Sequence, residues 1–302
     1  MARNKEERFT MNHQKYKSSW VLALTVTGLA ALLSGPSQAL AAPILGSDLA
    51  SFAVLGATTV TCVPTCTIGG NVGVAPGTAI TGGYSFTSGS LQSNTSLAQS
   101  AQVQLDASIL ALNAFGAGTT VAGGSLDLFQ ALNGGVITPG TYTVPALAVN
   151  LVGTLVLDGG GSNSALWVFQ MPSTLITSTV SNVRIQNVGD GANVGLFWNV
   201  HSAATINGPT FAGNVLANTL ISSDGNLTMA CGRLLSATAA VTLIQDKIST
   251  GCAGTGLAGS GGLNGGGGSN GGGGTVPEPA SLLLLGAGLA GIGIWRRRAG
   301  KN

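Results

Sequence analysis

Few side chains between residues 42 and 275 could support chemistry. This stretch holds seven aspartates, no glutamate, one lysine (Lys247) and one histidine (His201). General acid–base catalysis needs titratable groups that converge in one pocket, and these aspartates are spread along the whole stretch. A polysaccharide lyase would need clustered acids for calcium and a base for proton abstraction, and no such cluster is present in the sequence. The sequence therefore argues against an enzyme.

The four cysteines, Cys62, Cys66, Cys231 and Cys252, are an even number, as is typical of disulfides in an exported chain. Of the three possible arrangements, we favour Cys62–Cys66 with Cys231–Cys252. A zinc site is the alternative, but Cys-x₃-Cys provides only half of one. The lone His201 is expected to be a hydrogen-bonded surface or corner residue. No metal or cofactor is predicted.

The charges are concentrated at the two ends of the chain. Of twelve basic residues, five precede residue 20 and four follow residue 295. Residues 42–275 keep three basic residues, Arg184, Arg233 and Lys247, against seven acidic ones, so their formal charge is −4 although the whole chain has +2. A nucleic-acid-binding protein needs a basic surface to displace counterions from phosphates. That class is excluded.

The N-terminal segment, residues 1–41, has the pattern of a signal peptide. Residues 1–19 are polar and basic, residues 20–33 are apolar, and Ala39-Leu40-Ala41 supplies the small residues of a cleavage site. An uncleaved anchor is the alternative, but this apolar run is short for a membrane span. We expect export and a mature chain that begins at residue 42.

The C-terminal segment, residues 276–302, has three parts in a characteristic order. Val276, Pro277, Glu278 and Pro279 precede an apolar run (280–295) and three arginines. This order resembles a PEP-CTERM sorting signal. The resemblance implies a Gram-negative bacterium, an exosortase-type processing enzyme, and often an exopolysaccharide matrix nearby. It further implies a protein at the cell surface or secreted, held transiently in the membrane by this segment alone.

Residues 42–252 are expected to form the folded domain, joined to the tail by residues 253–275. More than half of this joining segment is glycine, which predicts a flexible tether. The domain shows short apolar or alternating runs rich in Val, Thr, Leu and Ile, which predict strands. One stretch, residues 94–115, places Ala101, Leu105, Ile109 and Leu112 on one stripe, with Asn94 or Thr95 as cap and Gly116 as stop. We therefore expect one helix beside a β body.

Weak repeats indicate how the strands are arranged. The sequence GNVLA at 213–217 is followed by a similar GRLLS at 232–236, and a related GNVGV lies at 70–74. A period of about 19 residues without a helix in each repeat suits a β-helix coil with three faces.

A longer series of motifs runs through the domain. It consists, in order, of FAVLG at 52–56, GGNVGVAPGT at 69–78, ITPGTY at 137–142, LVLD at 155–158, WVFQ at 167–170, FWNV at 197–200 and GRLLS at 232–236. The whole series is similar to the ice-binding-like family of antifreeze proteins. The resemblance implies an all-β-dominated fold. That fold is a right-handed, discontinuous, triangular β-solenoid with a long helix packed alongside, in which the N-terminal coil stacks beside C-terminal coils.

The resemblance also implies adsorption to ice through a flat solenoid face. Threonine is a good strand former on any exposed face, so the 25 Thr and 20 Ser of residues 43–252 favour ice only together with the resemblance. Strand alternation predicts that Val60, Leu220, Val241 and Leu243 point inward. The expected ice-contacting set is Thr59, Thr61, Thr154, Val156, Thr174, Ala203, Thr205, Thr219, Ile221, Ala240 and Thr242. Within this set Val156 and Ile221 depart from the hydroxyl pattern.

A structural matrix or adhesion module that holds exopolysaccharide is the alternative function. Rows of outward aromatic residues would favour sugar binding. Trp167, Phe169 and Trp198, however, have apolar neighbours and are expected to be buried.

Overall fold

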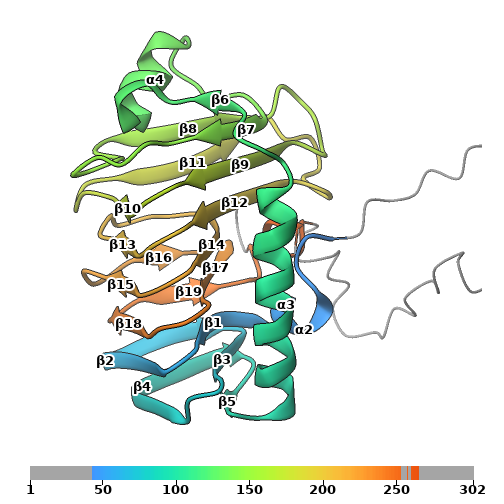
Figure 1. Ribbon diagram of the computed structural model, residues 1–302, viewed down its shortest axis with the longest axis vertical. Helices are drawn as coiled ribbons and strands as arrows, with labels where there is room; N and C mark the ends of the chain where they lie inside the picture. Colours follow the sequence, from blue (N-terminus) through green and yellow to red (C-terminus); the bar gives the residue numbers. More distant parts are fainter. Residues whose placement is uncertain (1–42, 253–256, 258–259, 265–302) are drawn as a thin grey trace, which may run out of the picture. The chain divides into compact units, whose positions relative to one another are not determined.

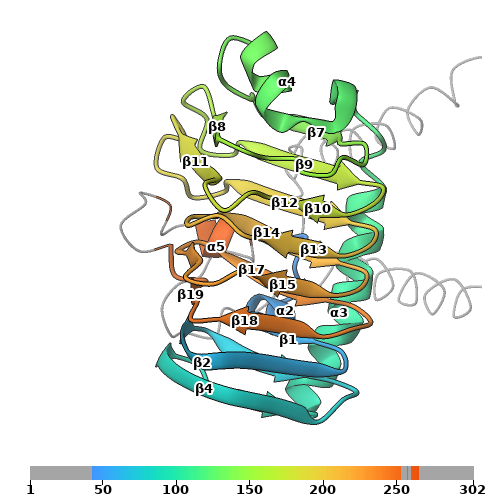
Figure 2. The same ribbon diagram turned by 90° about the vertical axis from the view of Figure 1, so that its left-hand side faces the viewer.

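The computed structural model describes residues 43–252, Leu257 and residues 260–264. The predicted signal peptide, the sorting motif Val276–Pro279 with its apolar segment, and most of the glycine-rich segment lie outside the described residues. The described chain winds in successive coils around one apolar core, and each complete coil contributes a strand or a bridged segment to three faces in turn (Figures 1 and 2).

Face A is a parallel nine-stranded sheet with the strand order β5-β3-β1-β17-β14-β12-β9-β7-β6. Its strands are β1 (Phe52–Gly56), β3 (Asn71–Val74), β5 (Leu91–Ser93), β6 (Thr119–Thr120), β7 (Gly140–Thr143), β9 (Leu166–Met171), β12 (Gly195–Val200), β14 (Gly213–Ala217) and β17 (Gly232–Ser236).

Face B follows face A along each coil and is also parallel. It comprises β10 (Leu175–Ile176), β13 (Ala204–Ile206), β15 (Ile221–Ser223), β18 (Val241–Ile244) and the first halves of β2 (Thr59–Gly69) and β4 (Ala79–Ser88).

Face C closes the coil before the chain returns to face A. It comprises β8 (Thr154–Asp158), β11 (Asn182–Gln186), β16 (Thr228–Met229), β19 (Lys247–Ser249) and the second halves of β2 and β4. Only single bridges through Thr210 join β11 to β16.

The stack of coils is discontinuous in sequence, as the resemblance implied. Strand β1 lies between β3 and β17, so the N-terminal coil sits beside the last coil. The chain then crosses from β5 to β6, at opposite ends of face A, through the helix α3 (Ser96–Asn113). This arrangement explains why residues 70–74 resemble residues 213–217.

Helix α3 is the helix expected over residues 94–115. Thr95 is its N-cap, with a hydroxyl oxygen that accepts a hydrogen bond from the Ala98 amide. The predicted stripe of Ala101, Leu105, Ile109 and Leu112 is buried against apolar residues that point outward from face A. One side of the solenoid is therefore covered by α3, which runs along the stack in Figure 1.

The other helical segments are short: α2 (Ser47–Ala50), a 3-10 turn (Ala122–Gly124), α4 (Leu126–Leu132) and α5 (Gly261–Asn264). Within the described ranges, none of the helices combines the length and apolarity that a membrane span requires.

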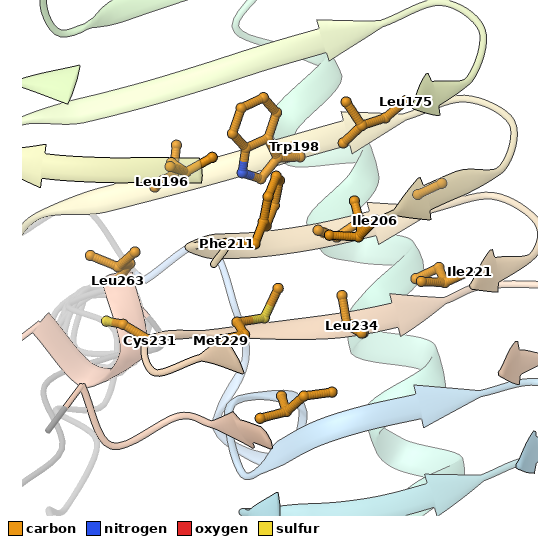
Figure 3. Packing of buried hydrophobic residues seen from close by; sticks show 14 of the residues in the cluster. Leu175, Leu196, Trp198, Ile206, Phe211, Ile221, Met229, Cys231, Leu234 and Leu263 are labelled. Atoms are coloured by element: carbon orange, nitrogen blue, oxygen red, sulfur yellow. The ribbon is translucent and has the colours of Figure 1, made fainter. Parts of the chain in front are cut away.

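A stack of aromatic rings fills the part of the core beside β7, β9 and β12. Phe169 and Trp198, paired in register on β9 and β12, are nearly parallel with ring centroids 4.3 Å apart. Tyr142 extends the stack on one side and Phe211 on the other. Figure 3 shows Trp198 among Leu196, Phe211 and Leu175. The aromatic residues expected to be buried, Trp167 included, are fully buried.

Both disulfides have the pairing favoured from the sequence. Cys62–Cys66 closes the exposed corner of β2 between faces B and C, where the pairing of β2 with β4 shifts register. Cys231–Cys252 joins the residue before β17 to the segment that follows β19. Each disulfide thus ties the chain together at a corner of a coil.

Asp246 occupies the buried corner between β18 and β19. Its carboxylate accepts hydrogen bonds from the Ser223 hydroxyl and from the Leu227 and Ile244 amides. Burial nevertheless raises the pKa of this carboxyl above its usual value, because desolvation outweighs these hydrogen bonds. The stability that this raised pKa contributes is complete below the unfolded pKa, about 3.9, and is lost as the pH rises through the native pKa.

Asp246→Asn should remove that pH dependence, because an amide does not ionise in this range. Thermal unfolding of the two proteins, measured at several values between pH 3 and pH 8, should show the variant gaining stability relative to the native chain as the pH rises. The variant can be less stable overall, since its amide replaces one acceptor by a donor. If the melting temperatures of the two proteins change in parallel with pH, the raised pKa of Asp246 is contradicted.

Candidate functional site

Face A offers no free surface along the part that α3 covers. Val168, Phe197, Leu216 and Leu235 point outward from its strands and are fully buried in the cluster that α3 completes. Faces B and C remain as the broad surfaces on which a site can be built.

Face B carries a row of outward residues in register on six strands. The pairing of β10, β13, β15, β18, β2 and β4 sets them directly beside one another. In order along the stack, this row contains Ile176, Thr205, Ser222, Thr242, Thr61 and Thr81.

A second row lies two residues earlier along each of these strand paths, and strand alternation turns it to the same side. Its members are Thr174, Ala203, Leu220, Ala240, Thr59 and Ala79. We call these two rows the face-B grid. The residues between them, from Leu175 and Ala204 to Val241 and Val60, point into the core and are buried.

The face-B grid is neutral and nearly regular. Neighbouring strands lie about 4.8 Å apart and the two rows about 6.7 Å apart. Seven of its twelve residues carry a hydroxyl, and none carries a charge. The Thr61 and Thr81 hydroxyl oxygens are 3.0 Å apart, and Ser222 donates to the Thr205 hydroxyl at 3.4 Å. Such a surface has hydroxyls at fixed spacings and no acid or base for catalysis.

Face C also has an outward row, but it is neither flat nor neutral. The row contains Thr154, Asn182, Thr210, Thr228, Lys247, Thr67 and Ser85. Next to it is a cavity of about 480 Å³, where β11 and β16 are joined only by the single bridges through Thr210. Arg184 and Leu257 are among the residues that line this cavity. Face C therefore lacks the regularity of face B.

Two family profiles match this chain, one over the solenoid and one over the C-terminal segment. The ice-binding-like family profile matches residues 54–249, which span faces A, B and C. The chain belongs to the ice-binding-like family. The PEP-CTERM protein-sorting motif matches residues 275–298, as the sequence indicated.

Relatives of this ice-binding-like chain cover most of its length. An ice-binding protein of Nostoc sp. (strain HG1) is 33% identical over 271 residues, which are 88% of this chain and 92% of the relative. The crystal structure of an ice-binding protein from Antarctomyces psychrotrophicus is 30% identical, with a TM-score of 0.55, and the match covers 67% of this chain and 96% of that one. An ice-binding protein from an Antarctic biological consortium is 27% identical, with a TM-score of 0.56 and coverage of 68% and 90%. The β-solenoid expected from the resemblance is thus the fold of the chain.

The structure places most of the expected ice-contacting residues of this family member on one surface. Thr59, Thr61, Thr174, Ala203, Thr205, Ala240 and Thr242 all belong to the face-B grid. The inward orientation predicted for Val60, Val241 and Leu243 is confirmed, since all three side chains are fully buried.

The prediction for the strand around residue 220 was wrong by one residue. Ile221 is fully buried and Leu220 is 40% exposed, the reverse of the expected orientation. Thr219 lies at the corner between faces A and B, where its amide binds the Ser202 carbonyl. The buried Ile221 pairs with Val241, so Ser222 is the residue of this strand that joins the first row.

Thr154 and Val156 were assigned to the wrong face. They lie on β8, which pairs with β11 on face C: Thr154 is beside Asn182 and Val156 beside Arg184. Face B at this height is formed instead by the segment around Leu151, which bridges to Thr177.

Five grid residues were missed: Ile176, Ser222, Leu220, Ala79 and Thr81. A recurring triplet would have identified Ala79 and Thr81, but not Ile176. Thr59-Val60-Thr61, Ala79-Ile80-Thr81, Ala203-Ala204-Thr205 and Ala240-Val241-Thr242 share a small residue, an apolar residue and a threonine. Aligning residues 220–222 with this triplet gives the observed orientation.

His201 is the corner residue that was expected. It is exposed after β12, and its Nε2 atom lies 3.1 Å from the Asn113 amide oxygen. Among the residues that the structure describes, no three His, Cys, Asp or Glu side chains gather in a way that would hold a metal ion.

Proposed function

We propose that this chain binds ice and that the face-B grid is the surface that adsorbs to it. The observation that carries the proposal is the register of five strands, which aligns Thr205, Ser222, Thr242, Thr61 and Thr81 in one row. The family and its relatives, named for ice binding, support the activity.

The physical mechanism requires no catalytic group. The strand and row spacings of about 4.8 and 6.7 Å are close to repeats of ice surfaces, so the hydroxyls can hold water in a similar pattern. Methyl groups of Thr and Ala between the hydroxyls bind water weakly, so they do not compete with that pattern. The solenoid core keeps the grid rigid, which lowers the entropy lost on adsorption.

The test is direct. Purified residues 42–264 should show thermal hysteresis and inhibit ice recrystallisation, whereas the same concentration of a non-binding protein of similar size should not. Absence of both activities in a folded, oxidised domain would overturn the proposal. The matrix or adhesion alternative is not favoured, because the comparisons point to ice and none points to exopolysaccharide.

We further propose that the chain is exported from a Gram-negative cell and retained at its surface through the sorting motif. An exosortase-type enzyme would process the tail, and only this tail would contact the membrane. The match of the sorting motif to residues 275–298 and a bacterial relative support this assignment.

Deletion of residues 276–302 should shift most of the protein from the cell-surface fraction to the medium. The fold should not change, because the strands of all three faces and helix α3 precede the deleted segment in the sequence. Immunoblots of both fractions and the melting temperature of the released protein measure the two effects. An unchanged surface fraction would contradict the role of the tail.

A further inference from the structure

The buried cation of the domain is Arg233, on β17. Its guanidinium donates to the carbonyl oxygen of Ala50 at 2.7 and 3.1 Å, and to the Asn214 side-chain oxygen at 2.8 Å. It also donates to the carbonyl oxygens of Gly261 and Gly262, at 3.0 and 2.9 Å. One side chain thus binds residues from both ends of the described chain.

All of these acceptors are neutral, although Arg233 is only 2% exposed. Burial lowers the pKa of the guanidinium to about 10, so the group still carries its charge at neutral pH. A buried charge without hydrogen-bond partners is very costly. The carbonyl groups of Gly261 and Gly262 are therefore part of what makes this buried position tolerable.

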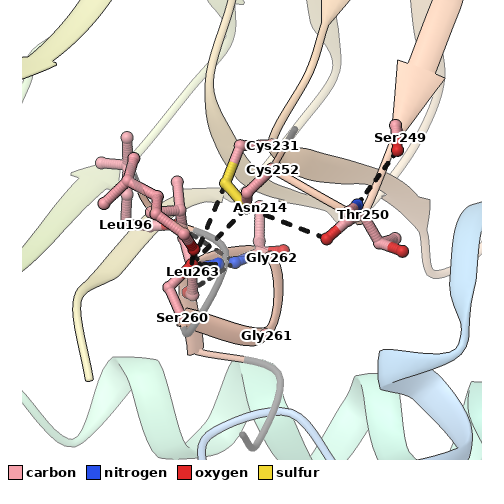
Figure 4. The surroundings of a disulfide bond; sticks show 12 residues. Leu196, Asn214, Cys231, Ser249, Thr250, Cys252, Ser260, Gly261, Gly262 and Leu263 are labelled. Atoms are coloured by element: carbon pink, nitrogen blue, oxygen red, sulfur yellow. Dashed lines mark hydrogen bonds between the residues drawn. A yellow bond between two sulfur atoms is a disulfide. The ribbon is translucent and has the colours of Figure 1, made fainter. Parts of the chain in front are cut away.

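The segment that supplies these carbonyls comes from the predicted tether, and it packs against the body. Leu257, Ser260 and Leu263 are all at most 3% exposed. The Asn214 side chain donates to the Leu263 carbonyl oxygen, and the Cys231–Cys252 disulfide lies beside Ser260 (Figure 4). The folded domain therefore extends beyond residue 252, the boundary expected from composition. We call Leu257 and residues 260–264 the strap.

The strap lies at one particular corner of the solenoid. Helix α5 contacts β12, β14 and β17, and Asn214 and Arg233 stand near the beginnings of β14 and β17. Each of these strands begins where the chain passes from face C to face A. In a coil with three faces, that corner is opposite face B.

We propose that Arg233 fastens the strap to the corner opposite face B, so that the sorting segment is joined to the domain on the side away from the ice-binding surface. This inference rests on the proposed function of face B. Arg233 is a positioning residue here: it contacts the strap and no part of the face-B grid. Fastening at residue 264 leaves only positions 265–275 before the sorting motif, and a chain of that length spans at most about 40 Å.

Hydrogen exchange of the chain 42–275, with a biotinylated peptide in place of residues 276–302, tests the strap. Amides of residues 260–263 should be protected in the native protein. In Arg233→Met they should exchange at least tenfold faster, while the amides of β15 and β18 stay protected. Arg233→Lys, which keeps a cation but loses the planar donors, should give intermediate protection. Free exchange at 260–263 in the native protein, or equal protection in all three proteins, would overturn the strap.

Attachment to beads tests the side from which the tail leaves. Streptavidin beads that hold the domain by its C-terminal biotin should adhere to a growing ice crystal. Beads that hold it through a maleimide at Thr242→Cys should lose at least nine-tenths of this adhesion, because the grid then faces the bead. If the C-terminally held domain fails to adhere while the same protein is active in solution, the proposed exit side is wrong. If it is inactive in solution, the function of face B fails, and the exchange experiment still decides the strap.

Discussion

Replacing Thr242 with tyrosine is expected to abolish most of the ice activity and to leave the fold intact. Thr242 is in the middle of the first row of the face-B grid, with Ser222 on one side and Thr61 on the other. A phenol ring there stands above the neighbouring hydroxyls, so ordered water no longer spans three strands. The melting temperature should hardly change, because exposed substitutions usually alter stability by no more than about 0.5 kcal/mol.

The matched control is the same substitution on the other free face. Thr228→Tyr and Thr154→Tyr place the ring on exposed strand positions of face C. These variants should keep at least four-fifths of the recrystallisation inhibition. Thr154→Tyr is the sharper of the two, because the sequence alone placed Thr154 on the ice-binding surface. If the face-C variants lose activity while Thr242→Tyr keeps it, the two faces have been assigned the wrong way round.

The sequence predicted most of the fold because the relevant signals are local. The stripe of Leu105, Ile109 and Leu112 lies within one helix, and the short alternating runs of apolar and polar residues lie within single strands. The discontinuous stacking came from the family resemblance, and it accounts for the similarity between residues 70–74 and 213–217, since both segments fill the same position in a coil.

The wrongly assigned face-B residues lie where the position of a solenoid corner decides which face a residue belongs to and which way it points. Alternation fixes which residues share a side within one strand, but it does not fix where the strand begins. The corner before β15 places Thr219 at the turn and moves Leu220 outward. Likewise, Thr154-Leu155-Val156 alternates like a face-B strand, and only its pairing with Asn182 and Arg184 shows that it belongs to face C.

The sequence analysis did not predict that the strap packs against the domain, because the composition of a segment does not reveal which residues elsewhere in the chain bind it. A segment with so many glycines has little apolar surface and a high entropic cost of ordering. Its docking depends on two leucines, Leu257 and Leu263, and on carbonyl groups that any residue provides. The partner that selects it, Arg233, is distant in sequence and belongs to a strand of the body.

Trp198→Ala should have the largest effect on stability and a small effect on ice binding. The indole is fully buried, stacks on Phe169 with centroids 4.3 Å apart, and donates to the Ala212 carbonyl oxygen at 3.0 Å. Truncating a buried Trp costs about 3–5 kcal/mol, and the unpaired carbonyl adds about 1 kcal/mol or more. For a domain of this size, we expect the melting temperature to fall by roughly 10 °C or more.

Ice activity is measured near the freezing point, where a domain destabilised by this amount is still folded, because stability usually peaks at low temperature. Trp198 reaches the core from face A and contacts Phe211, next to Thr210 on face C. Its neighbour on face B is Leu175, on the end strand of the grid, so the cavity left by alanine lies away from the middle of the row at Thr242. Trp198→Ala should therefore keep at least half of its recrystallisation inhibition, whereas Thr242→Tyr loses it at an unchanged melting temperature.

Leu128→Ala, which truncates an exposed leucine on α4, is the matched control for the melting experiment and should shift the temperature by less than about 2 °C. A Trp198→Ala domain that melts like the native protein would show that the aromatic stack does not hold the coils together. One that melts lower but has lost all ice activity while still folded in the assay would show that the grid depends on this part of the core.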